Sequence, residues 1–299
     1  MSPVKVAILT QNENAWCSIQ LKQAFAKLGV EPACYRFRDF AAWVAQDRGV
    51  EAGQVQVAKN LDGVVVRPIG GGSAEETFFR MDLLRRIEEE GVYVVNPADA
   101  IERAADKYRA LTLLRDRGLL TPRTIVTEDP TMAMRAFDEF NGDLVVKPLF
   151  GSRGVGVTRI RDREVAYRVC RTLAYFHHVL YLQQFIPHGR SDVRAFVVGD
   201  EVVAAMRRSA TGWKTNVAQG ARPQPYTVSK EERRLALEAA RALGCAVAGV
   251  DVMKTREGEF YVNEVNSQPD WRGLQSVATV SIAEKIARHV VRSVKGVSS

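Results

Sequence analysis

The sequence predicts an α/β (α+β) protein in which a small N-terminal parallel α/β domain precedes two α+β parts. Short apolar runs at 4–9, 64–66 and 92–95 alternate with helical stretches such as 19–28, a pattern typical of βαβ units. After Asn96-Pro97 the pattern changes, and from about residue 181 onward the strands form antiparallel hairpins. We therefore expect three parts, at 1–95, 96–183 and 184–299.

Capping signals place several helices. A serine three residues before a glutamate opens three of them, with the pairs Ser73/Glu76, Ser229/Glu232 and Ser281/Glu284. The first helix should end at Gly91, the second near residue 243, and the third should span 282–294. A fourth helix is predicted around 103–117, ended by Gly118, with strands following at 123–126 and 144–147.

Composition excludes several classes of protein. No run of about 18 apolar residues could span a bilayer, and the first residues lack the features of a signal peptide, so we expect a cytoplasmic protein. The four cysteines are scattered and indicate neither a disulfide framework nor a zinc site. The net charge is +7, but the lysines and arginines are mixed with acidic residues along most helices. This favours an anionic small substrate such as a nucleotide over nucleic acid.

The segment 247–266 carries the strongest chemical signal. With Glu257-Gly258 as the turn of a hairpin, counting outward pairs Met253 with Val262 and Asp251 with Glu264, whose β-carbons would lie about 4.5–5.5 Å apart. Asn266 projects to the same face because strand side chains alternate. Facing carboxylates repel unless a cation lies between them, and hard oxygen ligands select Mg²⁺ or Mn²⁺. The alternative is an exposed hairpin face with scattered acids.

A glycine-rich loop points to phosphate binding. The strand at 144–147 ends in Lys147 and continues as PLFGSRGVGV, with Gly151, Gly154 and Gly156 in the loop. Glycine lets backbone amides approach phosphate oxygens, and the lysine adds a fixed charge. The loop lacks the Walker pattern, so a plain glycine-rich hairpin turn is the alternative. Together with Lys107 and the metal hairpin, it indicates nucleotide chemistry.

These residues carry a family resemblance. Lys107, the KPLFGSRGVGV loop, QQFI, SDVRAFVVGDEVVAAMRR, WKTN, and GVD followed by NEVN resemble the ATP-grasp fold, and in order and spacing they are most similar to RimK-like glutamate ligases. The motifs cover roughly residues 96–290. The resemblance implies an ATP-grasp fold in which two α+β subdomains clasp ATP, and a homo-oligomer, either dimer or tetramer.

The resemblance also implies roles for individual residues. Lys107 and Lys147 would contact phosphates, and the loop with Gly151, Ser152, Gly154 and Gly156 would close over them. An adenine pocket would be lined by Gln183, Gln184, Phe185 and Ile186, with Asp192 near the ribose. Two magnesium or manganese ions would be held by Asp251, Glu264 and Asn266. The reacting carboxylate and incoming amino acid would face Arg208, Lys214 and Asn216.

The implied reaction is ATP-dependent addition of L-glutamate to an acceptor carboxylate through an acylphosphate, releasing ADP and phosphate. Trp271 and Arg272 stand where many relatives have small residues, and we interpret them as a stacking and pairing site for a small acceptor, such as a tetrahydromethanopterin-like or methylofuran-like cofactor. The alternative for Trp271 is a place in the core. A ribosomal protein or peptide C-terminus, an amino-group carrier in lysine biosynthesis, and another amino acid as donor remain open. So does a nucleotide-binding regulator without activity.

Overall fold

The N-terminal part is built on a parallel sheet. The computed structural model describes residues 3–45, 49–151 and 154–296. In sheet order, the four strands are β2 (Ala33–Tyr35), β1 (Val6–Leu9), β6 (Gly63–Val66) and β7 (Tyr93–Val95). All three pairings are parallel, which confirms the predicted βαβ arrangement. Its helices include α1 (Trp16–Ala26) and α3 (Ala74–Glu89).

A small antiparallel sheet interrupts this domain and was not predicted. It consists of β3 (Phe40–Ala42), β4 (Val50–Ala52) and β5 (Val55–Gln56), flanked by η1 (Phe37–Asp39) and α2 (Val57–Asn60). Each strand has only two or three residues, too few to leave a recognisable alternation of apolar and polar positions.

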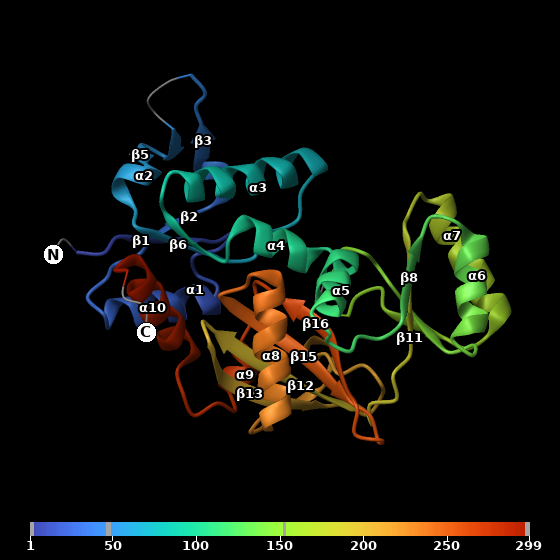
Figure 1. Cartoon of the computed structure of the whole chain (residues 1–299). Coiled ribbons are helices and arrows are strands. Elements are labelled where there is room, and N and C mark those ends of the chain that lie inside the picture. Colours follow the sequence, from blue (N-terminus) through green and yellow to red (C-terminus); the bar gives the residue numbers. More distant parts are fainter. Residues whose placement is uncertain (1–2, 46–48, 152–153, 297–299) are drawn as a thin grey trace.

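The middle of the chain forms an antiparallel sheet covered by two helices. The strand order is β10 (Thr158–Ile160), β9 (Leu144–Lys147), β11 (Leu180–Gln184) and β8 (Thr124–Thr127). Helices α6 (Pro130–Glu139) and α7 (Arg163–Tyr175) pack beside each other on this sheet, at the right of Figure 1. The glycine-rich loop joins the antiparallel strands β9 and β10 at the edge of the sheet.

The C-terminal part is a five-stranded antiparallel sheet. Its order is β14 (Arg222–Pro225), β13 (Glu201–Ser209), β12 (Ser191–Val198), β15 (Val247–Lys254) and β16 (Phe260–Asn266). The other elements of this region are η2 (Val217–Gln219), α8 (Lys230–Leu243), α9 (Arg272–Gln275) and α10 (Ile282–Val294). The predicted two-residue turn at Gly199-Asp200 joins β12 to β13.

The helix predicted at 103–117 is two helices, α4 (Ala98–Ala105) and α5 (Lys107–Asp116). Asp106 separates them because its backbone is extended and its side chain accepts hydrogen bonds from the N–H groups of Tyr108 and Arg109. The single-helix prediction was therefore wrong, and its correction places Lys107 at the first position of α5.

The capping predictions hold at the helix starts. Ser73 with Glu76 and Ser229 with Glu232 form complete capping boxes. Ser281 accepts the N–H of Glu284, but the Glu284 carboxylate binds the Lys27 ammonium at 2.7 Å instead of closing the box. The competing partner, Lys27, is the C-cap residue of α1 and lies far away in sequence.

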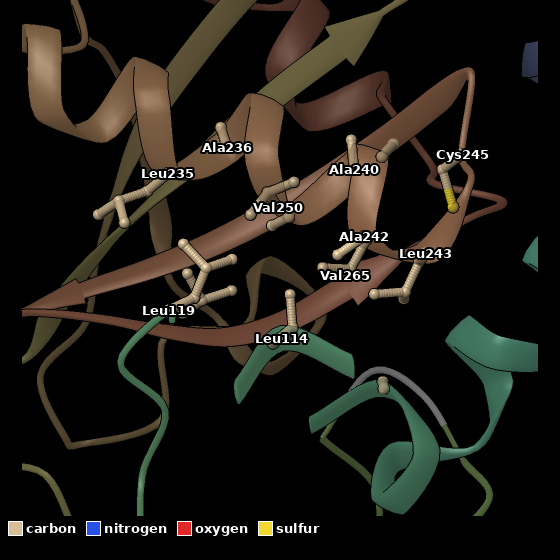
Figure 2. Packing of buried hydrophobic residues seen from close by; sticks show 14 of the residues in the cluster. Leu114, Leu119, Leu235, Ala236, Ala240, Ala242, Leu243, Cys245, Val250 and Val265 are labelled. Atoms are coloured by element: carbon tan, nitrogen blue, oxygen red, sulfur yellow. The ribbon is translucent and has the colours of Figure 1, made fainter. Parts of the chain in front are cut away.

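The hydrophobic cores contain residues from more than one of the three expected parts of the chain. Leu114 of α5 and Leu119 pack with Leu235 of α8 and with Val250 and Val265 of the C-terminal sheet (Figure 2). Helix α10 packs against α1 of the N-terminal domain. The two sheets of the N-terminal part lie within 1–95 and the five-stranded sheet within 184–299, whereas β11 of the central sheet ends at Gln184, one residue beyond 183. The division at 95 and 183 stays a prediction. This packing brings the central and C-terminal sheets together on either side of a cavity.

In the part of the chain that the structure describes, no helix has both the length and the apolarity required to cross a bilayer.

Candidate active site

A cavity lies between the central sheet, helix α5 and the C-terminal sheet. Most of the residues singled out from the sequence line it: Lys107, Lys147, Gly151, Gly154, Gln183, Gln184, Phe185, Ile186, Asp192, Arg208, Lys214, Asn216, Asp251 and Glu264. Gly156 and Asn266 are not among the lining residues, and Ser152 lies outside the described residues. The structure therefore gathers residues from α5, the central sheet and the C-terminal sheet, which are separate in sequence, around one space.

The predicted pairing of Asp251 with Glu264 is confirmed, but part of the reasoning behind it was wrong. Thr255 and Glu259 close a three-residue loop, and nearer the loop Met253 pairs with Tyr261 instead of Val262. The register then shifts at a β-bulge between Val252 and Asp251, where β16 contains one extra residue, Asn263. The longer loop shifts the register by one residue and the bulge shifts it back by one. The two carboxylates therefore face each other as predicted.

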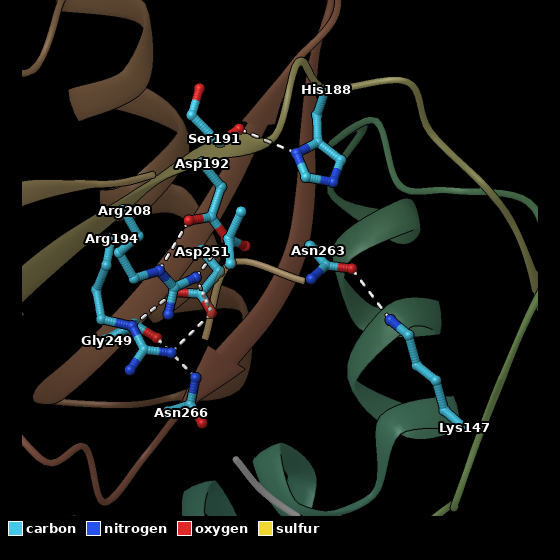
Figure 3. A network of polar contacts seen from close by, with 11 residues as sticks. Lys147, His188, Ser191, Asp192, Arg194, Arg208, Gly249, Asp251, Asn263 and Asn266 are labelled. Carbon is cyan, nitrogen blue, oxygen red and sulfur yellow. Dashed lines mark hydrogen bonds and ion pairs between the residues drawn. The ribbon is translucent and has the colours of Figure 1, made fainter. Parts of the chain in front are cut away.

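Asp251 is held by two arginines. Arg194 donates from Nε and Nη2 to the two carboxylate oxygens at 2.7 Å each, and Arg208 Nη2 lies 2.9 Å from Oδ2 (Figure 3). Burial raises the pKa of Asp251, but the charges of Arg194 and Arg208 outweigh it and hold the pKa below its ordinary value. Arg194 was missed, although it stands two residues after Asp192 and so on the same face of β12.

Asp192 and Arg208 form a second, buried pair across β12 and β13. Arg208 donates from Nε to Asp192 Oδ1 at 2.7 Å and from Nη2 to Oδ2, which also accepts from the Thr215 hydroxyl at 2.8 Å. Both partners are at most 4% exposed. Burial raises the pKa of Asp192 despite the opposing charge of Arg208. Both carboxylate oxygens are thus engaged by protein donors, and Asp192 positions Arg208 at the cavity wall.

Two lysines approach the glycine-rich loop from different elements. Lys107 donates to the carbonyls of Leu149 at 2.9 Å and Gly151 at 3.2 Å. Lys147 donates to Gln183 Oε1 at 2.6 Å and to Asn263 Oδ1 at 3.2 Å. Desolvation lowers the pKa of both ammonium groups, that of Lys147 to about 8, although the nearby charge of Glu264 acts in the opposite direction. Among the described residues, neither lysine has a carboxylate within ion-pair distance.

The glycine-rich loop contacts the opposite wall of the cavity. Gly154 has φ +72°, and a β-carbon there would lie 2.6 Å from Asn216 Oδ1, so only glycine fits this approach without displacement. Lys214 Nζ lies 5.5 Å from the centroid of the Trp213 ring, which packs edge-on against Phe185 at 6.0 Å. Trp213 was not singled out from the sequence.

The segment 183–186 links the two sheets. Its backbone is already engaged, since Gln184 N–H donates to Arg123 O at 2.8 Å and Phe185 N–H donates to Asp143 O at 3.2 Å. The Arg159 guanidinium lies 3.3 Å from the centroid of the Phe185 ring. These contacts fix an apolar ring and two glutamines at the cavity edge, and their place in an adenine pocket stays a prediction.

The interpretation of Trp271 as an acceptor contact was wrong. Its side chain is fully buried, packing edge-on against Phe196 at 6.1 Å and Trp16 at 6.3 Å. It belongs to the core shared by α1, α10 and the C-terminal sheet. The alternative, a place in the core, is confirmed.

Comparison with known proteins identifies the family. Residues 104–290 match the model of the RimK-like ATP-grasp domain, and residues 4–101 match the RimK PreATP-grasp domain. The chain belongs to the RimK-like ATP-grasp family. This confirms the resemblance drawn from the motifs and makes the chain an ATP-grasp ligase.

Members of the RimK-like ATP-grasp family and related folds match nearly the whole chain. A tetrahydromethanopterin:alpha-L-glutamate ligase of Methanococcus maripaludis is 33% identical over 288 residues, covering 95% of this chain and 96% of the relative. A probable alpha-L-glutamate ligase of Shewanella frigidimarina is 33% identical and covers 98% and 97%. The ATP-grasp ligase PsnB, solved with a minimal precursor, Mg and ADP, has a TM-score of 0.77 at 21% identity and covers 97% and 98%. A RimK domain protein from Sphaerobacter thermophilus has a TM-score of 0.75 at 25% identity, covering 96% and 100%.

The donor set of this RimK-like chain fits a hard divalent cation. Glu264 lines the cavity, and among the described residues its carboxylate makes no hydrogen bond or ion pair. Asn266 Nδ2 donates to Gly249 O at 3.4 Å, which leaves its side-chain oxygen available. Carboxylate and amide oxygens are the ligands that Mg²⁺ prefers. Asp251 is the exception, because its oxygens are engaged by Arg194 and Arg208.

Proposed function

We propose that this chain is an ATP- and magnesium-dependent ligase that adds L-glutamate to the carboxylate of a small acceptor cofactor. The observation that carries the proposal is a cavity lined by Lys107, Lys147 and Glu264. Among the residues that the structure describes, neither lysine has a carboxylate partner and the Glu264 carboxylate is unpaired. A group of cations opposite a hard-metal ligand suits a metal-bound polyphosphate.

The substrates would be held by the following residues. Lys107 and Lys147 contact phosphates, and the loop from Gly151 to Gly156, including Ser152, closes over them. The side chains of 183–186 and Trp213 enclose the base, and Asp192 lies on the side of the ribose, from where it positions Arg208 toward the reacting carboxylate. Asp251, Glu264 and Asn266 would hold two Mg²⁺ or Mn²⁺ ions, which would offset the charge of the transferring phosphoryl group. To serve as a ligand, Asp251 would have to give up a contact with Arg194 or Arg208. Lys214 and Asn216 lie where the loop meets the opposite wall, beside the reacting carboxylate.

The reaction needs no protein nucleophile. An acceptor carboxylate oxygen attacks the γ-phosphorus of ATP, the bond to the β-phosphate oxygen breaks, and ADP leaves. The neutral amine of glutamate then attacks the carbonyl carbon of the acylphosphate, phosphate departs, and the amine proton passes to phosphate or solvent. Closure of the glycine-rich loop excludes water that would hydrolyse the intermediate. Arg208, kept charged between two aspartates, stabilises the negative charge that develops on oxygen.

Relatives support the choice of glutamate and of a cofactor acceptor. Three relatives, from Methanococcus maripaludis, Methanocaldococcus jannaschii and Methanosarcina acetivorans, are 32% to 39% identical and are tetrahydromethanopterin:alpha-L-glutamate ligases. The argument from Trp271 falls away, because that ring is buried, so the small-acceptor proposal rests on these relatives. A cytoplasmic location and a dimeric or tetrameric state stay predictions.

The direct test is an acceptor-dependent assay. Purified protein is given Mg-ATP, glutamate and a tetrahydromethanopterin-type acceptor, and ADP and product mass are measured. We expect ADP only with acceptor and glutamate together, and a product heavier by one glutamate residue. Parallel arms use a peptide with a C-terminal glutamate and replace glutamate by aspartate or lysine. Acceptor-dependent ADP only in an alternative arm would overturn the assigned substrates, and none in any arm would overturn the ligase.

A further inference from the structure

His188 is a buried histidine on the wall of the nucleotide cavity, and the proposed reaction gives it no role. It lies in the loop between β11 and β12, and its side chain is 8% exposed. Its ring centroid is 6.1 Å from that of Phe185, so it lies next to the segment proposed to hold the base. It lines the same cavity as Glu264 and was not singled out from the sequence.

The hydrogen bond of the His188 ring determines which nitrogen carries the proton. Nδ1 lies 3.0 Å from Ser191 O, and because a carbonyl oxygen only accepts, Nδ1 is the donor (Figure 3). In the neutral ring the other nitrogen, Nε2, then carries a lone pair and is an acceptor. In Figure 3 this nitrogen points away from Ser191. The contact with Ser191 therefore fixes both the orientation of the ring and the acceptor role of Nε2.

Nε2 of His188 has no hydrogen-bond partner in the part of the chain that the structure describes. Within that part, the indole nitrogen of Trp271 is the one fully buried side-chain polar atom that lacks a partner. The unpaired Nε2 is therefore not enclosed by protein, and since His188 lines the cavity, Nε2 is open to that space. A ligand that fills the cavity and excludes water must bring a donor, or the acceptor is left unsatisfied at a cost.

The neighbouring side-chain acceptors on this wall are already engaged. Asp192, on the side of the ribose in the proposed function, accepts from Arg208 at both oxygens and from the Thr215 hydroxyl at one. Nearby amide oxygens also accept protein donors: that of Gln183 from Lys147, that of Gln184 from Arg123, and that of Asn263 from Lys147. His188 is therefore a neutral acceptor on this wall that a hydroxyl group of a ligand can reach.

We infer that Nε2 of His188 accepts a hydrogen bond from a ribose hydroxyl of the bound nucleotide, and so selects ribonucleotides over deoxyribonucleotides. The inference rests on the proposed function for the presence of ATP in this cavity. Along the chain, His188 lies between the base segment 183–186 and Asp192. The sugar of a nucleotide likewise follows the base, and its hydroxyls are donors, whereas ionised phosphate oxygens only accept and do not pair with Nε2.

The test compares nucleotides that differ by one hydroxyl group. The full chain with Mg²⁺ is titrated calorimetrically with ADP, 2′-deoxy-ADP and 3′-deoxy-ADP, which have no γ-phosphate to transfer. We expect wild type to bind ADP about tenfold more tightly than at least one deoxy analogue, which leaves Nε2 unpaired. His188→Asn keeps an amide donor for Ser191 O but has no acceptor at the place of Nε2. It should bind ADP about tenfold more weakly and that analogue as wild type does.

The ratio of the two affinities separates recognition of the sugar from a structural role of His188, which would affect all three nucleotides equally. His188→Gln brings an amide oxygen near the place of Nε2 and should restore part of the discrimination. His178→Asn, at an exposed histidine, is the matched control and should discriminate as wild type does. If His188→Asn does not fold, His188→Ala replaces it, with the same expected loss of discrimination.

Equal binding of all three nucleotides by wild type would overturn the inference while leaving the proposed function intact. A folded His188→Asn or His188→Ala protein that keeps the wild-type ratio, or that loses affinity equally for all three, would also overturn it. Wild type that binds none of the three would contradict nucleotide binding itself, and with it both the proposed function and the inference.

Discussion

Lys147 donates a 2.6 Å hydrogen bond to Gln183 Oε1, and the acceptor is a neutral amide rather than a carboxylate. Gln183 is in turn fixed by the Thr124 hydroxyl, to which its Nε2 donates at 2.9 Å. The amide aims the ammonium group without neutralising it. The charge of Lys147 is therefore available to a phosphate. Its pKa is lowered because the ammonium group is desolvated at this site.

Nucleotide affinity should fall as the pH rises above 8. In the free protein Lys147 loses its proton through a pKa of about 8, whereas phosphate oxygens beside it favour the protonated form. Below pH 8 the proton is already present. Above pH 8 binding must take up a proton, so affinity should decline by up to about tenfold per pH unit. Calorimetric titration with AMP-PNP across this range measures the slope.

Lys147→Arg is the control for this titration, because arginine stays charged throughout. Its affinity should be flat where the wild type declines. An equal decline in both proteins would assign the pH dependence to another group.

Replacing Glu264 with glutamine should abolish most ligase activity. The substitution removes a carboxylate that lines the cavity and has no hydrogen-bond or ion-pair partner among the described residues. We expect turnover to fall by roughly 100-fold or more, with weaker dependence on added magnesium. Glu257→Gln, in the exposed turn of the same hairpin, is the matched control. Steady-state ADP release at several magnesium concentrations tests this, and comparable losses in both variants would refute a metal role specific to Glu264.

The register of that hairpin could be predicted only in part from the position of its turn and the alternation of its side chains. Asp251 opposite Glu264 follows from strand alternation and a turn signal, both local in sequence. Counting residues from the turn does not predict the extra residue Asn263, because the bulge depends on contacts with residues that are remote in sequence. Here Lys147, from another sheet, donates to the Asn263 amide. The pairing was predicted correctly because two errors of one residue cancelled.

Asp192→Asn should destabilise the fold by about 3 kcal/mol. It removes the main partner of a buried guanidinium and leaves Arg208 with Asp251 alone. The double variant Asp192→Asn/Arg208→Met should lose less, since no uncompensated charge stays buried. Urea unfolding of the two variants and wild type measures this, and a double variant less stable than the single would contradict it.

Trp271 and Trp213 should respond differently to truncation. Trp271→Ala empties a fully buried site and should cost about 3–5 kcal/mol of unfolding free energy. Trp213 is partly exposed beside Phe185, so Trp213→Ala should cost about 1 kcal/mol or less and instead weaken AMP-PNP binding. Thermal unfolding and calorimetry separate the two effects. A stable Trp271→Ala protein would contradict its place in the core.

The error over Trp271 has a physical origin. The sequence places the tryptophan five residues after the metal hairpin's last strand, beside arginine and aspartate, which suits an exposed site equally well. Its burial depends on Trp16 and Phe196, which are remote in sequence and meet only when α1 docks on the C-terminal sheet. Conversely, the pair of Arg194 with Asp251 was within reach, because Asp192 and Arg194 alternate with apolar residues on one strand.

The measurement that most directly tests ligation through an acylphosphate is isotope transfer. The acceptor is prepared with ¹⁸O in its reacting carboxylate, the reaction is run with Mg-ATP and glutamate, and the released phosphate is analysed by mass spectrometry. The account predicts one ¹⁸O atom in each phosphate released with amide product. Phosphate free of label, with amide nonetheless formed, would contradict attack of the acceptor carboxylate on the γ-phosphorus.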